Sequence, residues 1–234
     1  MTATPPRSVA RPLLRQSWRD VAFLHWTVDP AVAATLLPTG VRPDMFGGRT
    51  FVGVVALRMR STAPVATLRI PWLSTFGQVN VRLYTVDRHG HRGVVFLRSD
   101  ADRLLPVLAG RTALRLPYAW SRTQHTADGD RHTYLVEAHS GRVREQMVLR
   151  VGRRHYPNKL ERFLVDRWGL NTRLGARTVY LPLEHGPWPL HTAELEECSA
   201  ALVGAAGLPS VSGPPISVLF SPGVDDVRIG SALR

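Results

Sequence analysis

One stretch decides the fold, Gln78–Ala101, which reads QVNVRLYTVDRHGHRGVVFLRSDA. Two runs of alternating apolar and polar residues flank the segment DRHGHR, and such alternation is typical of β-strands. If the runs fold as a hairpin centred near residue 90, their apolar side chains share one face. In that register Arg82 faces Arg98 and Asn80 faces Asp100. We therefore expect one polar face that carries Asn80, Arg82, Arg98 and Asp100.

Further strands are expected on both sides of this hairpin. Val21–Val28 and Thr50–Arg60 precede it, and the turn sequences Asp128-Gly129 and Ser140-Gly141 separate the strands that follow it. The second turn would place Glu137 opposite Arg144 as a cross-strand ion pair. The pattern gives about ten strands joined mostly by hairpins, which predicts a mostly β (α+β) domain, an antiparallel barrel-like sheet with a few short peripheral helices.

Three short helices are predicted outside the sheet. Asp29-Pro30 is typical of a helix start, with Asp29 as N-cap and Pro30 at the first helical position. Asn158–Trp168 has helical spacing of its apolar residues, and Asn158 is a plausible N-cap. Glu194–Ala206 is expected to form the last helix, which Gly207 would end.

Length and composition indicate one globular domain. The 234 residues can bury a single core, and no linker divides them, so we expect a loose N-terminal arm over residues 1–15 and one domain over residues 16–234. No apolar run is long enough to span a membrane, and the N-terminus does not read as a secretory signal. The single cysteine, Cys198, is expected to be a buried apolar group, and a free thiol favours a reducing, cytoplasmic location.

The net charge raises the question of nucleic acid. Thirty basic and eighteen acidic residues give 30 − 18 = +12, and all basic residues except Lys159 are arginine. The arginines are spread along the whole chain instead of gathering in one basic stretch, so the sequence does not favour a nucleic-acid partner. It favours a small-molecule ligand and predicts no membrane contact. It does not decide whether the protein forms an oligomer.

Few residues carry a chemical signal. No nucleotide-binding glycine motif, metal-ligand spacing or nucleophile elbow is present, so we expect no metal and no cofactor. The polar hairpin face could line an interior, where Arg82 or Arg98 would bind a carboxylate or phosphate and Asp100 could transfer a proton, or it could simply face solvent. Tyr118 could donate a hydrogen bond into a site or pack its ring, and Trp188, fixed between prolines, could wall a pocket or cap the core.

Several segments in order resemble the YqjF-like family, a family of unknown function usually grouped with the acetoacetate decarboxylase-like superfamily. They are QSWRDVAFLHWTVDP, LLPTGVRPDMFGGRTFVGVVALRMR, NVRLY, DAD, GRTALRLPY, EHGPWPLH and SPGVDDVRIG. The resemblance runs from about Gln16 to Ile229. It implies a β-barrel-like fold with a closed, mostly apolar lumen.

The resemblance also bears on the chemistry. In the decarboxylases a Gly-Arg-Glu triplet precedes a Pro-Lys step, and that lysine forms a Schiff base with the keto acid. Here the corresponding residues are Gly110-Arg111-Thr112 and Pro117-Tyr118. A tyrosine cannot form an imine, and the only lysine, Lys159, lies far along the chain, so a Schiff-base reaction is not expected.

Three functions are left open by these residues. The first is a lyase, hydratase or isomerase without Schiff-base chemistry, with Asn80, Arg82, Arg98, Arg111 and Trp188 around the ligand and Tyr118 and Asp100 as candidates for proton transfer. The second is a ligand-binding barrel without catalysis. The third, which the scattered arginines disfavour, is a basic protein that binds nucleic acid.

Overall fold

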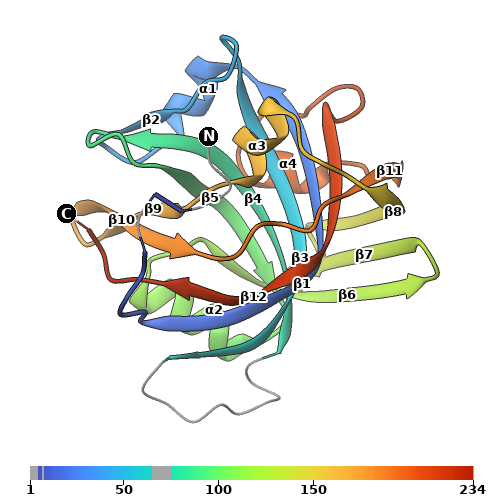
Figure 1. The fold of residues 1–234 in the computed structure, drawn as a ribbon, viewed down its shortest axis with the longest axis horizontal. Coiled ribbons are helices and arrows are strands. Elements are labelled where there is room, and N and C mark those ends of the chain that lie inside the picture. The colour runs from blue at the N-terminus through green and yellow to red at the C-terminus, as the bar shows by residue number, and fades with distance from the viewer. Residues whose placement is uncertain (1–4, 7, 65–74, 234) are drawn as a thin grey trace.

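The fold is mostly β-structure (Figure 1). The computed structural model describes residues 5, 6, 8–64 and 75–233, with residues 61–64 described by their backbone; the predicted arm of residues 1–15 therefore lies partly outside the described residues. No helix among them is long and apolar enough to cross a membrane. In chain order the elements are β1 (Leu14–Val28), α1 (Pro30–Thr35), β2 (Val41–Pro43), β3 (Thr50–Pro64), β4 (Phe76–Asp87), β5 (Arg92–Ala101), α2 (Leu104–Ala113), β6 (Tyr118–Asp128), β7 (Arg131–Ala138), β8 (Arg144–Arg154), α3 (Lys159–Val165), β9 (Gly169–Leu174), β10 (Arg177–Glu184), β11 (His191–Glu197), α4 (Ala201–Ala205) and β12 (Ser217–Ile229).

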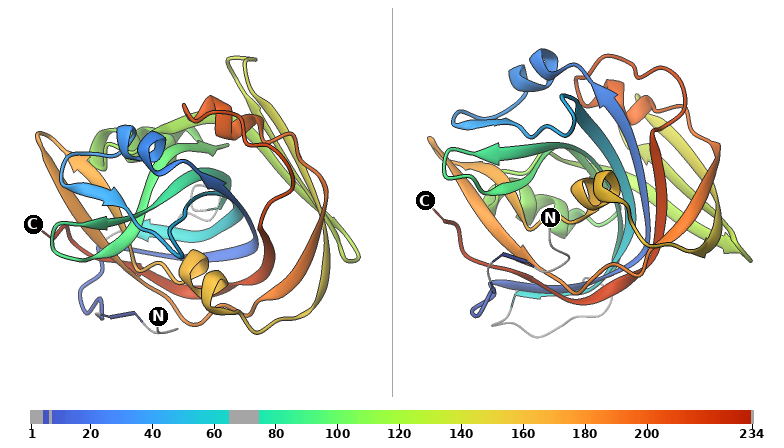
Figure 2. Two further views of the ribbon diagram at one scale, coloured as in Figure 1. Left: turned by 90° about the horizontal axis from the view of Figure 1, so that it is seen from above. Right: turned by 45° about the horizontal axis from the view of Figure 1, so that its top comes forward.

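Seven of the strands form a ring. β12, β1, β3, β4 and β5 are neighbours in that order, and β5 continues through β9 and β10 back to β12 (Figure 2). The closing contact is short, with Leu183 opposite Ile229 and Glu184 opposite Arg228. We call the inside of this ring the lumen. The mostly β fold is thus confirmed, although β5 pairs in parallel with β6 and β9, so the sheet is mixed.

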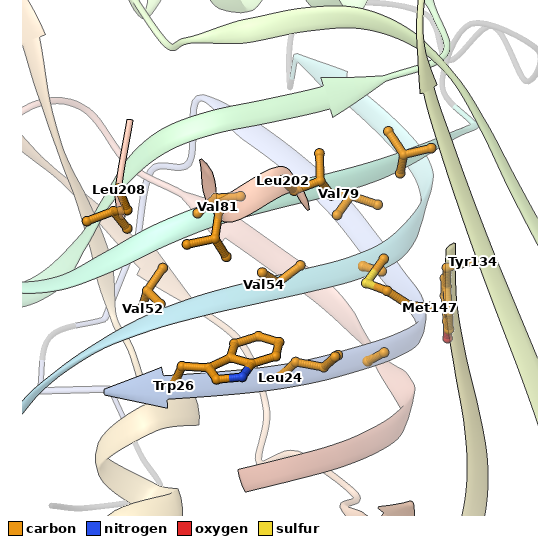
Figure 3. Close-up of a cluster of buried hydrophobic side chains, with 14 of the residues drawn as sticks. Leu24, Trp26, Val52, Val54, Val79, Val81, Tyr134, Met147, Leu202 and Leu208 are labelled. Carbon is orange, nitrogen blue, oxygen red and sulfur yellow. The ribbon is translucent and has the colours of Figure 1, made fainter. Parts of the chain in front are cut away.

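The remaining long strands cover the outside of the ring. β6, β7, β8 and β11 branch from β5 and return to β12, and together with α4 they face the outer side of β1, β3 and β4. Leu24, Val54 and Val81 of these three strands belong to the same cluster of buried side chains as Met147 of β8 (Figure 3). We call this cluster the outer core. Because side chains alternate along a strand, β1, β3 and β4 separate the outer core from the lumen.

The predicted register of the central hairpin was wrong. Arg82 faces Phe96 and not Arg98, and Asn80 faces Ser99 and not Asp100. A β-bulge at the step between the Val81–Arg98 and Arg82–Phe96 pairs inserts Leu97 as an extra residue. One extra residue exchanges the faces of all residues beyond it, so Arg98 and Asp100 lie on the side of Val79 and Val81.

Two helix starts and one ion pair were predicted correctly. The Asp29 side chain accepts hydrogen bonds at the start of α1, and Asn158 and Glu161 form a capping box at the start of α3. Glu137 lies opposite Arg144 with an N–O distance of 3.3 Å. The helix expected over Glu194–Ala206 was wrong, because its first part is β11 and only Ala201–Ala205 is helical.

Candidate functional site

The lumen contains a cavity of about 130 Å³. Residues from β1, β3, β4, β5, β9, β10 and β12 line it, together with the first residue of β6, the segment that follows α2, and the last residue of α3 with the segment that follows it. Its wall is mostly apolar and aromatic. The polar side chains that interrupt this wall are Gln16, Gln78, Asn80, Arg82, Tyr118, Arg167 and His185.

Arg82 is the cationic group that β4 directs into the lumen. Its guanidinium lies 5.8 Å from the centre of the Phe23 ring and 5.6 Å from that of Tyr84, and Nε donates a long hydrogen bond of 3.4 Å to the Tyr84 hydroxyl. Its Nη2 atom is buried and has no hydrogen-bond partner, and no carboxylate in the described part of the chain forms an ion pair with Arg82. A partly buried cation without a counterion is unfavourable, and an anion in the lumen would relieve this.

Arg167, by contrast, is already neutralised. Its Nη1 donates to Asp44 at 2.6 Å, its Nε donates to the Phe163 carbonyl at 2.7 Å, and its guanidinium stacks 4.1 Å from the Phe163 ring centre. Arg92 also donates to Asp44, at 2.9 Å. Only Nη2 of Arg167 is buried without a partner. Arg167 therefore adds positive potential to the lumen while Arg82 carries the unpaired charge.

Three polar residues lie along one wall of the cavity. Gln78 donates to the Ser99 hydroxyl at 2.9 Å and accepts from the Tyr118 hydroxyl at 3.3 Å. Burial raises the pKa of Tyr118 to about 12, so its hydroxyl stays protonated at neutral pH. Asn80 Oδ1 is buried without a partner. This wall can therefore offer a hydroxyl donor and a free amide oxygen to a ligand.

Two neutral imidazoles lie near Arg82, and one of them, His185, lines the cavity. Burial lowers the pKa of His185 to about 4, and Arg82 adds to the effect. Burial, followed by Arg82, also holds the pKa of His25 well below its usual value. His185 packs against Trp188 with ring centres 4.7 Å apart, and Trp188 stacks on Trp18. Trp188 thus lines the cavity as part of an aromatic wall, and its indole N–H is bonded to the Val165 carbonyl.

The structure brings only part of the predicted site together. Asn80, Arg82, Tyr118 and Trp188 all line the cavity. Arg98 and Asp100 do not, because the bulge places them on the outer face. There Arg98 binds Asp100 through two hydrogen bonds of 2.7 Å, Ser121 donates to the same carboxylate at 2.6 Å, and the two charged side chains are only 17% and 1% exposed.

Arg111 also lies outside the cavity. It is exposed, and its Nε donates to the Tyr118 carbonyl at 2.6 Å, so it holds the Tyr118 backbone in place. Gly110 assists, because a Cβ atom there would come within 2.5 Å of the Tyr118 ring. The Gly-Arg segment therefore supports Tyr118 and does not contact the lumen itself.

Sequence reasoning missed Gln16, Gln78, Arg167 and His185. Gln78 lies on the same alternating face as Asn80 and Arg82, so the period of the strand was a usable signal for it. Arg167 lies two residues beyond the end of α3, and the helix over this segment was predicted from its apolar residues alone. His185 precedes the Pro-Trp-Pro loop, and nothing in its sequence neighbourhood indicates that its ring is buried.

Comparisons with known proteins agree with this architecture. The sequence model of the family DUF2071, described as "Uncharacterized conserved protein", matches residues 15–225. The chain is 26% identical over 211 residues to the "Uncharacterized protein YqjF" of Bacillus subtilis, covering 87% of this chain and 86% of that protein.

Among solved structures, the fold is similar to acetoacetate decarboxylase from Legionella pneumophila, with a TM-score of 0.65 at 14% identity over 97% of this chain and 90% of that one. An acetoacetate decarboxylase-like enzyme from Sphingomonas wittichii gives a TM-score of 0.65 at 16% identity, covering 98% and 95%. The enduracididine biosynthesis enzyme MppR, in complex with pyruvate, gives 0.65 at 15% identity, covering 97% and 92%. At such low identities these matches establish the acetoacetate decarboxylase-like fold alone.

Proposed function

The chain belongs to the DUF2071 family of uncharacterized conserved proteins, and we propose that its lumen binds a small organic carboxylate. The observation that carries the proposal is the guanidinium of Arg82, which lines the cavity with a buried, unpartnered Nη2. A guanidinium binds a carboxylate through parallel hydrogen bonds, and the low dielectric of an apolar cavity strengthens that bond.

The size of the cavity limits the ligand. At about 130 Å³ it is close to the engineered cavity of about 150 Å³ that accommodates benzene. A ligand of roughly six non-hydrogen atoms fills such a space. The carboxylate would face Arg82, and the remainder of the ligand would pack against the aromatic wall that includes Trp188. Pyruvate, which is bound in a structure of MppR, has this size and charge.

The chemistry would differ from an imine mechanism. Tyr118 lines the cavity, whereas the only lysine, Lys159, is exposed at the start of α3. The groups in the lumen that can move protons are the Tyr118 hydroxyl, which is a donor at neutral pH, and the neutral imidazole of His185. A neutral acid and a neutral base beside an anionic ligand suit proton transfer next to a carbonyl group.

Replacing Arg82 by methionine is expected to abolish carboxylate binding without destabilising the free protein. Methionine keeps most of the side-chain volume and removes a partly buried cation that has no counterion among the described residues. At 100 times its dissociation constant a ligand stabilises by about 2.7 kcal/mol, which raises Tm by about 5 to 10 °C in a chain of this size. Thermal-shift measurements against small carboxylates, 2-oxo acids and phosphates test this.

The matched control is Arg144→Gln, which removes one positive charge from an arginine that is 71% exposed. It should respond to the ligands like the wild type. A carboxylate that stabilises the wild type and Arg82→Met equally would contradict the proposal, as would a panel of small carboxylates without any response.

A second candidate function, catalysis, is favoured by the position of the Tyr118 hydroxyl in the cavity. We expect the wild type to exchange the protons next to the carbonyl of a bound 2-oxo acid with deuterium from the solvent. Tyr118→Phe should bind that acid within about threefold of the wild type and exchange at least about 100-fold more slowly. Proton NMR in D2O measures the exchange, and binding without exchange in the wild type would indicate a ligand-binding protein.

A further inference from the structure

A second polar cluster lies outside the lumen, near the turn of the β6–β7 hairpin. His125 of β6 and His132 of β7 pack with ring centres 5.2 Å apart, and His125 Nε2 lies 3.0 Å from His132 Nδ1. Neither histidine lines the lumen cavity. His132 is buried against the ring of Phe220, with ring centres 4.4 Å apart, so the imidazole has little freedom to move away.

Asp20 of β1 is directed toward this pair by an irregularity in its strand. The pairing of β1 with β3 shifts register between Arg19 and Ala22, and Asp20 has a positive φ of 50°. Tyr134 donates to the Asp20 carbonyl at 2.7 Å and holds the irregular backbone. Asp20 Oδ2 lies 3.9 Å from His125 Nδ1. Bulges and left-handed residues that persist despite strain commonly direct a side chain into a functional site.

We propose that Asp20, His125 and His132 bind a divalent transition-metal ion of the Zn²⁺ class. One ligand atom of each residue lies within 4.8 Å of the others. Two imidazoles and one carboxylate are a donor set that suits Zn²⁺, and three protein ligands leave a coordination position free for water or substrate.

The spacing of the two imidazoles fits a shared ion. Two nitrogens 3.0 Å apart, each bonded to one ion at about 2.05 Å, subtend about 94° at it, between octahedral and tetrahedral geometry. Asp20 Oδ2 lies 3.9 Å from Nδ1 of His125, whereas His132 approaches Nε2 of that ring, so a shared ion requires a rotation of the His125 ring or of the Asp20 side chain. Burial lowers the pKa of His125 to about 4 and also lowers that of His132, so protons compete little for their nitrogens at neutral pH.

The residues around the cluster leave a path for a metal ion, and one of them competes with the ion for the Asp20 carboxylate. His125 lines a cleft of about 200 Å³, together with Arg58 and Asp102, through which an ion can reach the pair. Arg58 also donates to Asp20, through Nε at 2.7 Å and through Nη2. The metal ion and the guanidinium would therefore share one carboxylate, and the positive charge of Arg58 should weaken metal binding.

Calorimetric titration of metal-free, full-length protein with ZnCl2 tests the proposal, and CoCl2 titration followed by visible absorption reports the coordination geometry. The wild type should bind one equivalent of either ion. His132→Gln and Asp20→Asn should each bind at least about 100-fold more weakly. His139→Gln changes an exposed histidine whose ring lies 4.2 Å from that of Trp120, and it should bind like the wild type. Circular dichroism of each variant ensures that a loss of binding is not a loss of folding.

Two results would overturn the site. One is a wild type that binds Zn²⁺ no more tightly than His132→Gln or Asp20→Asn, in which case the 3.0 Å contact is only a hydrogen bond between two neutral rings. The other is the result for Arg58→Gln. We expect this variant to bind Zn²⁺ about tenfold more tightly than the wild type, because it lacks the positive charge that competes for Asp20. An equal or weaker affinity of that variant would remove Asp20 from the set of ligands.

Discussion

Replacing Asp44 by alanine is expected to lower the free energy of unfolding by about 3 to 5 kcal/mol, because it leaves a buried arginine without its counterion. The Asp44 and Arg167 side chains are only 6% and 3% exposed, and they are joined by a hydrogen bond of 2.6 Å. The carboxylate also accepts from Arg92, so one substitution breaks two charged contacts. Neither water nor another carboxylate can easily replace Asp44 at this depth.

Urea unfolding followed by tryptophan fluorescence measures this loss. The matched control is Asp130→Ala, which breaks the exposed ion pair with Arg150 and should cost less than about 1 kcal/mol. Comparable losses in the two variants would show that Arg167 finds another partner or enough water. The expected loss would also show that the two lumen arginines differ in how their charge is compensated. Arg167 needs a protein counterion, whereas Arg82 has none among the described residues.

Replacing Gly223 by alanine is expected to destabilise the protein by about 3 kcal/mol or more. Gly223 lies in β12 opposite Arg19 of β1, and its φ of +128° is a conformation that residues with a Cβ rarely adopt. A Cβ atom there would also overlap the backbone carbonyl of Trp18. Because the obstacle is backbone and not a flexible side chain, β1 and β12 would have to separate at this pair.

Thermal unfolding followed by circular dichroism measures this effect. Gly213→Ala is the control, because Gly213 has a φ of +75° but open space around its Cβ position. That variant should lose only about 1 to 2 kcal/mol through backbone strain. If both variants lost the same amount, the close approach of β12 to Trp18 would contribute nothing.

Short sequence patterns correctly predicted those strands and helix starts that depend on interactions between residues close in sequence. The alternation in Gln78–Ala101 indicated the hairpin, and Asp29 and Asn158 indicated two helix starts, because a cap acts within three residues. The register failed because a bulge leaves no clear mark in sequence: Leu97 is an ordinary apolar residue in an ordinary strand. The exchange of faces by Arg98 and Asp100 followed from that single insertion.

The polar clusters depend on contacts between distant segments. Asp44 and Arg167 are 123 residues apart, and Asp20 reaches His125 only because the β6–β7 hairpin lies over β1. No spacing rule could have linked these residues, so the proposed metal site could not be predicted from the sequence. The last helix was overestimated for a related reason: Glu194 and Leu195 pair with β8, and this tertiary pairing overrides their helical preference.

The wall shared by the lumen and the outer core has an evolutionary consequence. Along β4, Gln78, Asn80 and Arg82 line the cavity, while Val79 and Val81 pack in the outer core. Substitutions at every second position can therefore change which molecules the lumen admits without opening a hole in the outer core. Homologous proteins can therefore diverge in ligand specificity through such substitutions while their common fold stays the same.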